Sequence, residues 1–254
     1  MTDAAGSTSD VTRHMTTLRC DVTGGVATIT LNRPESRNAL NLAMCEELRA
    51  AATGAAADPA VKLVLIRASG SVFCAGADLK ERQGMGEAQV RERRMRAFAA
   101  YAAIEALPMP AIAVVEGQVV GSGCEIAAAC DFIVATPAAS FRVPEAIRGT
   151  VGATQRLPRI LGKRLAKDLL FTGRTLSAEE AERHGLVARL VEPDKLEAVL
   201  AEIIKTIAEA PAQALRLAKR CVDRGVELDA KGALETEIAA IEEQLAAGEW
   251  MGKR

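Results

Sequence analysis

Two glutamates that lie twenty positions apart give the clearest chemical signal in this chain of 254 residues. Glu125 follows the small-residue segment Gly-Ser-Gly-Cys at 121–124, and Glu145 follows Phe-Arg-Val-Pro at 141–144. Each lies in an apolar setting, in which a lone carboxylate is costly to bury. We therefore predict that the two belong to one site at which carboxyl groups take up and release protons.

Two turns rich in small residues accompany the glutamates. The segment 73–80 reads Phe-Cys-Ala-Gly-Ala-Asp-Leu-Lys, and the second turn is 121–123. Small residues let backbone N–H groups come close to a ligand, and the first turn of a helix leaves its N–H groups unpaired. One N–H from each turn could hold the oxygen of a thioester or similar carbonyl as it becomes an enolate. The pattern favours a site that polarises a carbonyl and moves protons beside it.

The local position of each glutamate bears on its role. We expect Glu125 in the first turn of a helix, beside the N–H donors, and we expect a strand near 131–136 to bring Glu145 to the same place. Two neighbouring carboxylates raise each other's proton affinity, so one can act as a base while the other acts as an acid. Each element alone also has a structural interpretation, since a Gly-Ser-Gly turn commonly opens a helix and a glutamate after Pro144 suits a helix N-terminus. The combination is what indicates catalysis.

Other reactive side chains have simpler interpretations. Cys124 has no accompanying histidine motif, so we expect a small buried thiol. His184 precedes Gly185, and we expect it at the end of a helix. Four arginines lie close together in the sequence: Arg91, Arg93, Arg94 and Arg96. Glu92 interrupts them, which favours a solvated helix face over a nucleic-acid-binding patch.

The elements that must position these residues alternate between strands and helices. Apolar periodicity and turn residues predict, in order, a hairpin of strands 18–21 and 26–31, a helix over 41–53, a strand over 61–66, a helix within 84–107, a strand over 111–115, a helix over 126–130 and a strand over 132–134. Helices that alternate with parallel strands indicate an α/β core.

Beyond Glu192 only helical patterns remain. The apolar stripes are Leu196, Leu200, Ile203 and Ile207, then Leu215 and Val222, then Leu234, Ile238, Ile241 and Leu245. Such one-sided helices must pack on their own core or on a neighbouring subunit. We therefore divide the chain into a flexible tail over 1–14, an α/β core over 15–194 and a helical region over 195–254.

Composition excludes several classes of protein. The net charge of −1 gives no general attraction to nucleic acid or to an anionic membrane. Six scattered cysteines without a CxxC pair favour neither a disulfide framework nor a zinc site, and they suit a reducing cytoplasm. No secretory signal and no apolar stretch of membrane-spanning length is present in the sequence. We expect a cytoplasmic protein without a metal.

A set of motifs in order resembles one family, the enoyl-CoA hydratase/isomerase (crotonase) superfamily. The matching segments are 31–34, 38–41, 73–80, 121–131, 144–145, 154–158, 171–174 and 185–187. The resemblance runs from about Leu18 to the end of the chain. It implies a spiral of ββα units and a C-terminal helical region used to form a homotrimer, often a hexamer of two trimers.

The resemblance also assigns roles to individual residues. It implies that the backbone N–H groups of Ala77 and Ser122 form an oxyanion hole, and that Glu125 and Glu145 are catalytic. Further substrate- and CoA-binding positions are implied at Arg37, Ala39, Ala75, Gly76, Asp78, Leu79, Lys80 and Gly121. Coenzyme A would be part of the substrate, with no separate cofactor.

The activity implied is that of an enoyl-CoA hydratase, a lyase that adds water to a 2-enoyl-CoA in fatty acid metabolism (β-oxidation) or branched-chain acid metabolism. Two departures from the family pattern keep alternatives open. Ser122 replaces the usual glycine, and the segment 149–154 is shorter than the family's loop. The alternatives are an enoyl-CoA delta-isomerase, which needs only one mobile proton carrier, and a catalytically weak acyl-CoA-binding or RNA-binding member of the family.

Overall fold

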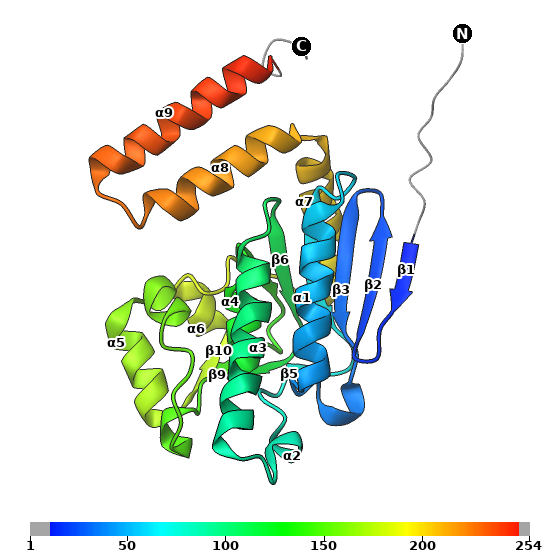
Figure 1. Ribbon diagram of the computed structural model, residues 1–254, viewed down its shortest axis with the longest axis vertical. Coiled ribbons are helices and arrows are strands. Elements are labelled where there is room, and N and C mark those ends of the chain that lie inside the picture. Colours follow the sequence, from blue (N-terminus) through cyan, green and yellow to red (C-terminus); the bar gives the residue numbers. More distant parts are fainter. Residues whose placement is uncertain (1–10, 249–254) are drawn as a thin grey trace.

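The computed structural model describes residues 11–248, which form two β-sheets with helices around them (Figure 1). The large sheet has the strand order β1-β2-β3-β4-β6-β8-β11. Its strands are β1 (Val11–His14), β2 (Leu18–Thr23), β3 (Val26–Leu31), β4 (Leu63–Ala68), β6 (Ala111–Val115), β8 (Phe132–Ala135) and β11 (Arg189–Leu190). The pairings from β3 to β11 are parallel, and β1, β2 and β3 are antiparallel.

A small sheet lies beside the large one and carries the segments of chemical interest. Its order is β10-β9-β7-β5, with strands β5 (Val72–Cys74), β7 (Gln118–Val120), β9 (Ser140–Arg142) and β10 (Thr175–Ser177). The pairs β5–β7 and β7–β9 are parallel. Strands β5, β7 and β9 each follow a strand of the large sheet along the chain, which gives a repeated ββα unit. The fold is therefore the expected α/β spiral of ββα units.

Most of the helices lie against the two sheets. In chain order they are α1 (Leu42–Ala57), α2 (Leu79–Arg82), α3 (Glu87–Glu105), α4 (Ser122–Ala128), α5 (Arg156–Thr172), α6 (Ala178–Arg183), α7 (Leu196–Glu209), α8 (Ala212–Gly225) and α9 (Ala230–Ala247). Three short 3-10 turns complete the described elements: η1 (Pro34–Ser36), η2 (Ala146–Arg148) and η3 (Pro193–Lys195).

Strand β4 shows how the large sheet is buried on both faces. Val64 and Ile66 belong to the main core with α1 and α3, whereas Leu63 and Leu65 belong to a second cluster with α7. Side chains alternate between the faces of a strand, so a continuous apolar run is what a strand covered on both sides requires. The predicted strand over 61–66 is confirmed, displaced by two residues at each end.

The helices α8 and α9 pack against each other away from the sheets (Figure 1). A salt bridge of 2.8 Å between Lys219 and Asp131 ties α8 to the body of the molecule. One face of α9 exposes large apolar side chains: Leu234, Ile238, Ile241 and Leu245. The three predicted helices are confirmed, and the last of them leaves much of its apolar stripe uncovered.

The amino-terminal prediction is only partly within the described residues. Residues 1–10 of the expected tail, 1–14, lie outside them. The remaining four, Val11–His14, form β1 and pair with β2 from Val11↔Val22 to His14↔Arg19. None of the described helices is both long and apolar enough to cross a membrane.

Candidate active site

A cavity of ≈ 420 Å³ brings the sequence-predicted chemistry together. One side is formed by the segments that follow β5, β7 and β9, with Ala77, Ser122, Glu125 and Glu145 among the lining residues. The other side is formed by α3 and the segment 149–153.

The topology of the small sheet explains why these distant residues meet. Strands β5, β7 and β9 are parallel neighbours, so their carboxyl ends lie at the same edge. Ala77 follows β5, Ser122 and Glu125 follow β7, and Glu145 follows β9. Ligand sites in α/β proteins commonly form at such an edge.

The two expected N–H donors are available. Neither the Ala77 N–H nor the Ser122 N–H donates a hydrogen bond to another described residue. Ser122 is the first residue of α4, where N–H groups have no partner within the helix. Gly76, at φ +96°, brings its turn against the Val120 carbonyl, so the two turns lie in contact. Both residues line the cavity, which is consistent with the predicted oxyanion hole.

Glycines enclose Glu145. A Cβ added at Gly121 would overlap Glu145 Oε1, and one added at Gly152 would lie 2.9 Å from Glu145 Cγ. Gly121 also has φ +51°, a conformation that favours glycine. The carboxyl group therefore occupies space that side chains at 121 and 152 would fill.

The environment of Glu145 favours its protonated form. Burial raises the pKa of Glu145 above its ordinary value, and the nearby Glu125 charge raises it further, while Arg148 and Arg94 oppose the rise. Its Oε2 atom is buried and has no hydrogen-bond partner among the described residues. An uncompensated buried carboxylate is costly, which is the physical reason for the shift.

Glu125 lies in a different environment. It is in the first turn of α4, as predicted, and is buried. Its Oε2 atom accepts a hydrogen bond of 2.7 Å from Arg156 Nη1, while Arg156 Nη2 contacts Glu105 Oε2 at 2.6 Å. A guanidinium at this distance forms a charge-assisted hydrogen bond that fixes the orientation of the carboxyl group. The two glutamates thus differ: Glu125 is paired with a cation, and Glu145 Oε2 has no hydrogen-bond partner among the described residues.

Sequence reasoning missed the role of Arg156. The residue belongs to a segment, 154–158, whose family motif is recognisable, but nothing local connects it to a glutamate 31 positions earlier. The centre of its guanidinium lies 5.9 Å from the centroid of the Tyr101 ring, which also lines the cavity. A partly buried arginine placed over an aromatic ring is well placed to hold one orientation.

Several expected binding residues lie in the cavity wall and others lie outside it. Ala75, Gly76, Leu79 and Gly121 line the cavity. The described lining does not include Arg37, Ala39, Asp78 or Lys80. Their contact with CoA stays a prediction.

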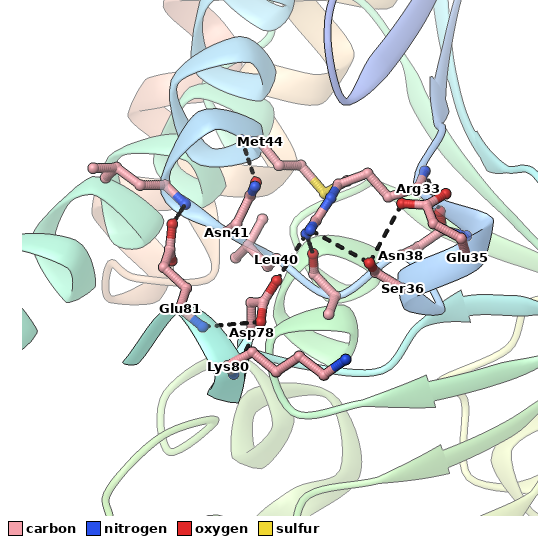
Figure 2. Close-up of polar contacts among 12 residues, drawn as sticks. Arg33, Glu35, Ser36, Asn38, Leu40, Asn41, Met44, Asp78, Lys80 and Glu81 are labelled. Carbon is pink, nitrogen blue, oxygen red and sulfur yellow. Dashed lines mark hydrogen bonds and ion pairs between the residues drawn. The ribbon is translucent and has the colours of Figure 1, made fainter. Parts of the chain in front are cut away.

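Asp78 stabilises the local structure around the turn that carries Ala77. Its carboxylate accepts hydrogen bonds from the N–H groups of Lys80 and Glu81 at the start of α2, and it forms a 3.0 Å salt bridge with Arg33 (Figure 2). Arg33 also donates to the Ala39 carbonyl. These contacts hold the segment before α1 against the oxyanion turn, so Asp78 positions the turn that carries Ala77.

The prediction of a solvated arginine face on α3 is wrong for Arg93. This side chain is 4% exposed and contacts Glu81 Oε2 at 2.7 Å and the Leu40 carbonyl. Arg94 also turns inward and bonds to Thr150 Oγ1 at 2.9 Å and to the Val151 carbonyl. Arg91 and Arg96 are exposed, as expected. Arg93 and Arg94 point inward because they bond to groups outside α3 and so hold this helix against its neighbours.

The remaining reactive groups are not arranged for other chemistry. Cys124 is buried, its thiol is directed at the Val119 and Arg142 carbonyls, and burial raises its pKa, as expected for an inert thiol. His184 ends α6 as predicted. Over residues 11–248 there is no cluster of three or more His, Cys, Asp or Glu side chains suited to a metal ion.

Comparison with known proteins agrees with this geometry. The family model of Enoyl-CoA hydratase/isomerase matches residues 21–249. A probable enoyl-CoA hydratase of Mycobacterium bovis is 41% identical over 205 residues, which cover 80% of this chain and 79% of that protein. A crotonyl-CoA hydratase of Syntrophomonas wolfei is 38% identical over 85% of this chain and 84% of its own length. The crystal structure of an enoyl-CoA hydratase from Bacillus anthracis superposes with a TM-score of 0.85 at 38% identity, covering 89% of this chain and 90% of the other. The chain therefore belongs to the enoyl-CoA hydratase/isomerase family.

Proposed function

We propose that this protein is an enoyl-CoA hydratase that adds water reversibly to a 2-enoyl-CoA thioester. The observation that carries the proposal is the unequal pair of glutamates, Glu125 and Glu145, beside two unpaired backbone N–H groups. Relatives named as hydratases, including a crotonyl-CoA hydratase, support the same activity.

The thioester carbonyl is bound first. Its oxygen accepts hydrogen bonds from the N–H groups of Ala77 and Ser122, both of which line the cavity. These donors are in place before the reaction. Their hydrogen bonds to the oxygen strengthen as negative charge develops on it. Polarisation makes the β-carbon of the enoyl group electrophilic.

Water addition uses the different environments of the two glutamates. Glu125, held by Arg156, accepts a proton from water as the water oxygen bonds to the β-carbon. The electron pair of the double bond moves into the enolate held by the two N–H groups. Glu145, whose pKa is raised by burial, delivers its proton to the α-carbon. A proton then passes from Glu125 back to Glu145, and the pair is restored.

The coenzyme A portion is proposed to extend toward Arg37, Ala39, Asp78 and Lys80. Lys80 is exposed on α2, next to Leu79 in the cavity wall, so its ammonium group can meet phosphates. Arg37 donates to Gln118 Oε1 at 2.6 Å and lies beside the same turn. A positive charge at the nucleotide end suits an anionic carrier.

A decrease in the conjugated enoyl absorbance of but-2-enoyl-CoA on adding the protein tests the activity. A folded protein that leaves this absorbance unchanged would contradict the proposal. Turnover of but-3-enoyl-CoA by a protein that does not hydrate but-2-enoyl-CoA, retained in Glu125→Gln, would favour the delta-isomerase instead, because isomerisation needs one mobile proton carrier.

We also propose that the protein acts in the cytoplasm, in fatty acid or branched-chain acid metabolism, as a homotrimer or a hexamer. The exposed apolar face of α9, with Leu234, Ile238 and Ile241, supports assembly, since such a stripe is unfavourable in water. Light scattering after size exclusion measures the mass directly, and a monomer at micromolar concentration would exclude the trimer.

A further inference from the structure

The segment 149–153 forms a thin wall of the cavity, on the side away from the strand ends. It lines the cavity together with α3, and Val151 at its middle is 69% exposed. Phe98, on the α3 part of the same side, is 46% exposed. Such exposure shows that little packed core lies behind this wall, so apolar packing contributes little to keeping it closed.

The two ends of the segment are anchored, whereas its middle is not. At the start, the Thr150 N–H donates to the Glu145 carbonyl at 2.9 Å. At the end, Ala153 is buried in the main core. Between these anchors, the N–H groups of Val151 and Gly152 donate no hydrogen bond to another described residue. The middle of the segment must therefore be held by contacts from elsewhere.

Arg94 makes those contacts from α3. Its Nη2 atom donates to Thr150 Oγ1 at 2.9 Å and also to the Val151 carbonyl. No other side chain among residues 11–248 donates a hydrogen bond to the segment. Hydrogen bonds from a charged donor are the stronger class, so these two join the helix and the segment into one continuous wall.

The wall that Arg94 joins lies at the acyl end of the site. Gly152 packs on the side chain of Glu145, which acts at the α-carbon in the proposed reaction. The side proposed for CoA is marked instead by Lys80 of α2. An acyl chain that continues beyond the reacting carbons therefore runs toward Val151 and Phe98. Each further methylene would normally tighten binding, but a closed wall leaves it no space.

We propose, on the basis of the hydratase function above, that Arg94 sets the length of acyl chain that the site accepts. By bonding to Thr150 and Val151 it keeps the segment 149–153 closed over the acyl end of the cavity, which restricts the substrate to short-chain 2-enoyl-CoA thioesters. Without these bonds the middle of the segment moves outward into solvent, and a longer chain enters without disturbing the core.

The test compares two saturated thioesters that differ only in chain length, butanoyl-CoA and octanoyl-CoA. Calorimetry measures both dissociation constants, and no turnover is needed. In the wild-type protein, octanoyl-CoA should bind no more tightly than butanoyl-CoA, because the closed wall excludes its additional methylenes. In Arg94→Gln, octanoyl-CoA should bind about 10-fold or more tightly than butanoyl-CoA, because the methylenes then gain apolar contact. The same ratio of dissociation constants in both proteins would overturn the proposal.

Three further variants separate the bonds of Arg94 from its charge. Thr150→Val keeps the shape of that side chain and the charge of Arg94 but removes one bond, so it should give part of the change. Arg94→Lys keeps the positive charge that acts on Glu145 and should restore part of the wild-type ratio. Arg91→Gln is the matched control, because Arg91 is an exposed arginine of α3 outside the cavity lining. An equal change in Arg91→Gln, or an equal weakening of both thioesters in Arg94→Gln, would refute the assignment.

Trypsin measures the opening of the segment without any ligand. Arg148 is exposed and directly precedes the segment, so cleavage after it reports how often the segment leaves the wall. Arg94→Gln should be cut there about 10-fold faster than Arg91→Gln, since loss of bonds from a charged donor raises the open population by that order. Both variants lack one arginine of α3, which makes the comparison even. Equal cleavage rates would show that Arg94 does not hold the segment.

Hydration rates separate this inference from the proposed activity. But-2-enoyl-CoA and oct-2-enoyl-CoA are compared in the wild-type protein and in Arg94→Gln. If the ratio of the two hydration rates is the same in both proteins, the role of Arg94 alone is overturned. Arginine-dependent choice between butanoyl-CoA and octanoyl-CoA, without hydration of either enoyl thioester, supports the role of Arg94 in acyl binding and overturns the hydratase.

Discussion

The two sides of the cavity are built differently. The side formed at the strand ends consists of backbone N–H groups, close-fitting glycines and buried carboxyl groups. The side formed by α3 and the segment 149–153 presents longer side chains, of which Phe98 is 46% and Val151 69% exposed. We infer that different parts of the fold determine the reaction and the choice of substrate. The reaction depends on the ends of a parallel sheet, whereas the choice of substrate depends on a helix and a loop that can vary.

The largest effect is expected on the strand-end side. Glu145→Gln should lower kcat by about 10²- to 10⁴-fold, the usual contribution of a general acid or base. Steady-state hydration of but-2-enoyl-CoA measures this. Glu192→Gln, at an exposed position remote from the cavity lining, serves as the control and should retain wild-type rates. A Glu145→Gln enzyme within threefold of wild type would place the proton donor elsewhere.

A smaller loss of activity is expected when Arg156, which holds Glu125, is replaced. Arg156→Gln leaves Glu125 without its cation and should lower kcat by about 10- to 100-fold, in the range of one to two hydrogen bonds to a charged group. Arg156→Lys should recover part of the loss, because charge is kept while the two-carboxylate fork is not. A change in KM with kcat untouched would show that Arg156 serves binding alone.

On the helix side, substitution should change preference more than rate. Phe98 packs edge-on against Tyr101, with ring centroids 6.3 Å apart, and also lines the cavity. Phe98→Ala should shift kcat/KM toward longer acyl chains by about 3- to 10-fold, since each buried methylene contributes roughly 0.8 kcal/mol. Rates along a C4 to C10 series measure the shift. A uniform 100-fold loss over all chain lengths would contradict the separation of the two sides.

The smallest expected effect is on stability. Glu145→Gln, which should lower kcat, should raise the stability of the folded protein. Because burial raises the pKa of Glu145, the folded protein binds its proton more tightly than the unfolded chain, so this residue costs stability as pH rises above the unfolded value. Glu145→Gln should therefore raise Tm at pH 7 by about 2 °C, and the difference should vanish near pH 4, where both states hold the proton. Thermal unfolding at pH 4 and pH 7 measures it; a Tm difference that grows on acidification would contradict the raised pKa.

Local sequence patterns predicted much of this structure. They did not predict contacts between residues that are far apart in the chain. A helix at this point and the first-turn position of Glu125 follow from small residues before an apolar run, but the helix spans Ser122–Ala128 and not the predicted 126–130. The small sheet did not follow, because strands as short as Val72–Cys74 give no period and resemble turns. The partner of Glu125 and the inward direction of Arg93 depend on contacts between residues far apart in the chain, which periodicity does not encode.

The glycines on either side of Glu145 have a consequence for the timing of catalysis. Because Gly121 and Gly152 lie against Glu145 on two sides, they limit the conformations of its side chain before any substrate arrives. Aligning the proton donor then adds little to the activation entropy of each turnover. Lengthening the segment that contains Gly152 would let the Glu145 side chain adopt more conformations. Each turnover would then include the entropy loss of ordering that side chain.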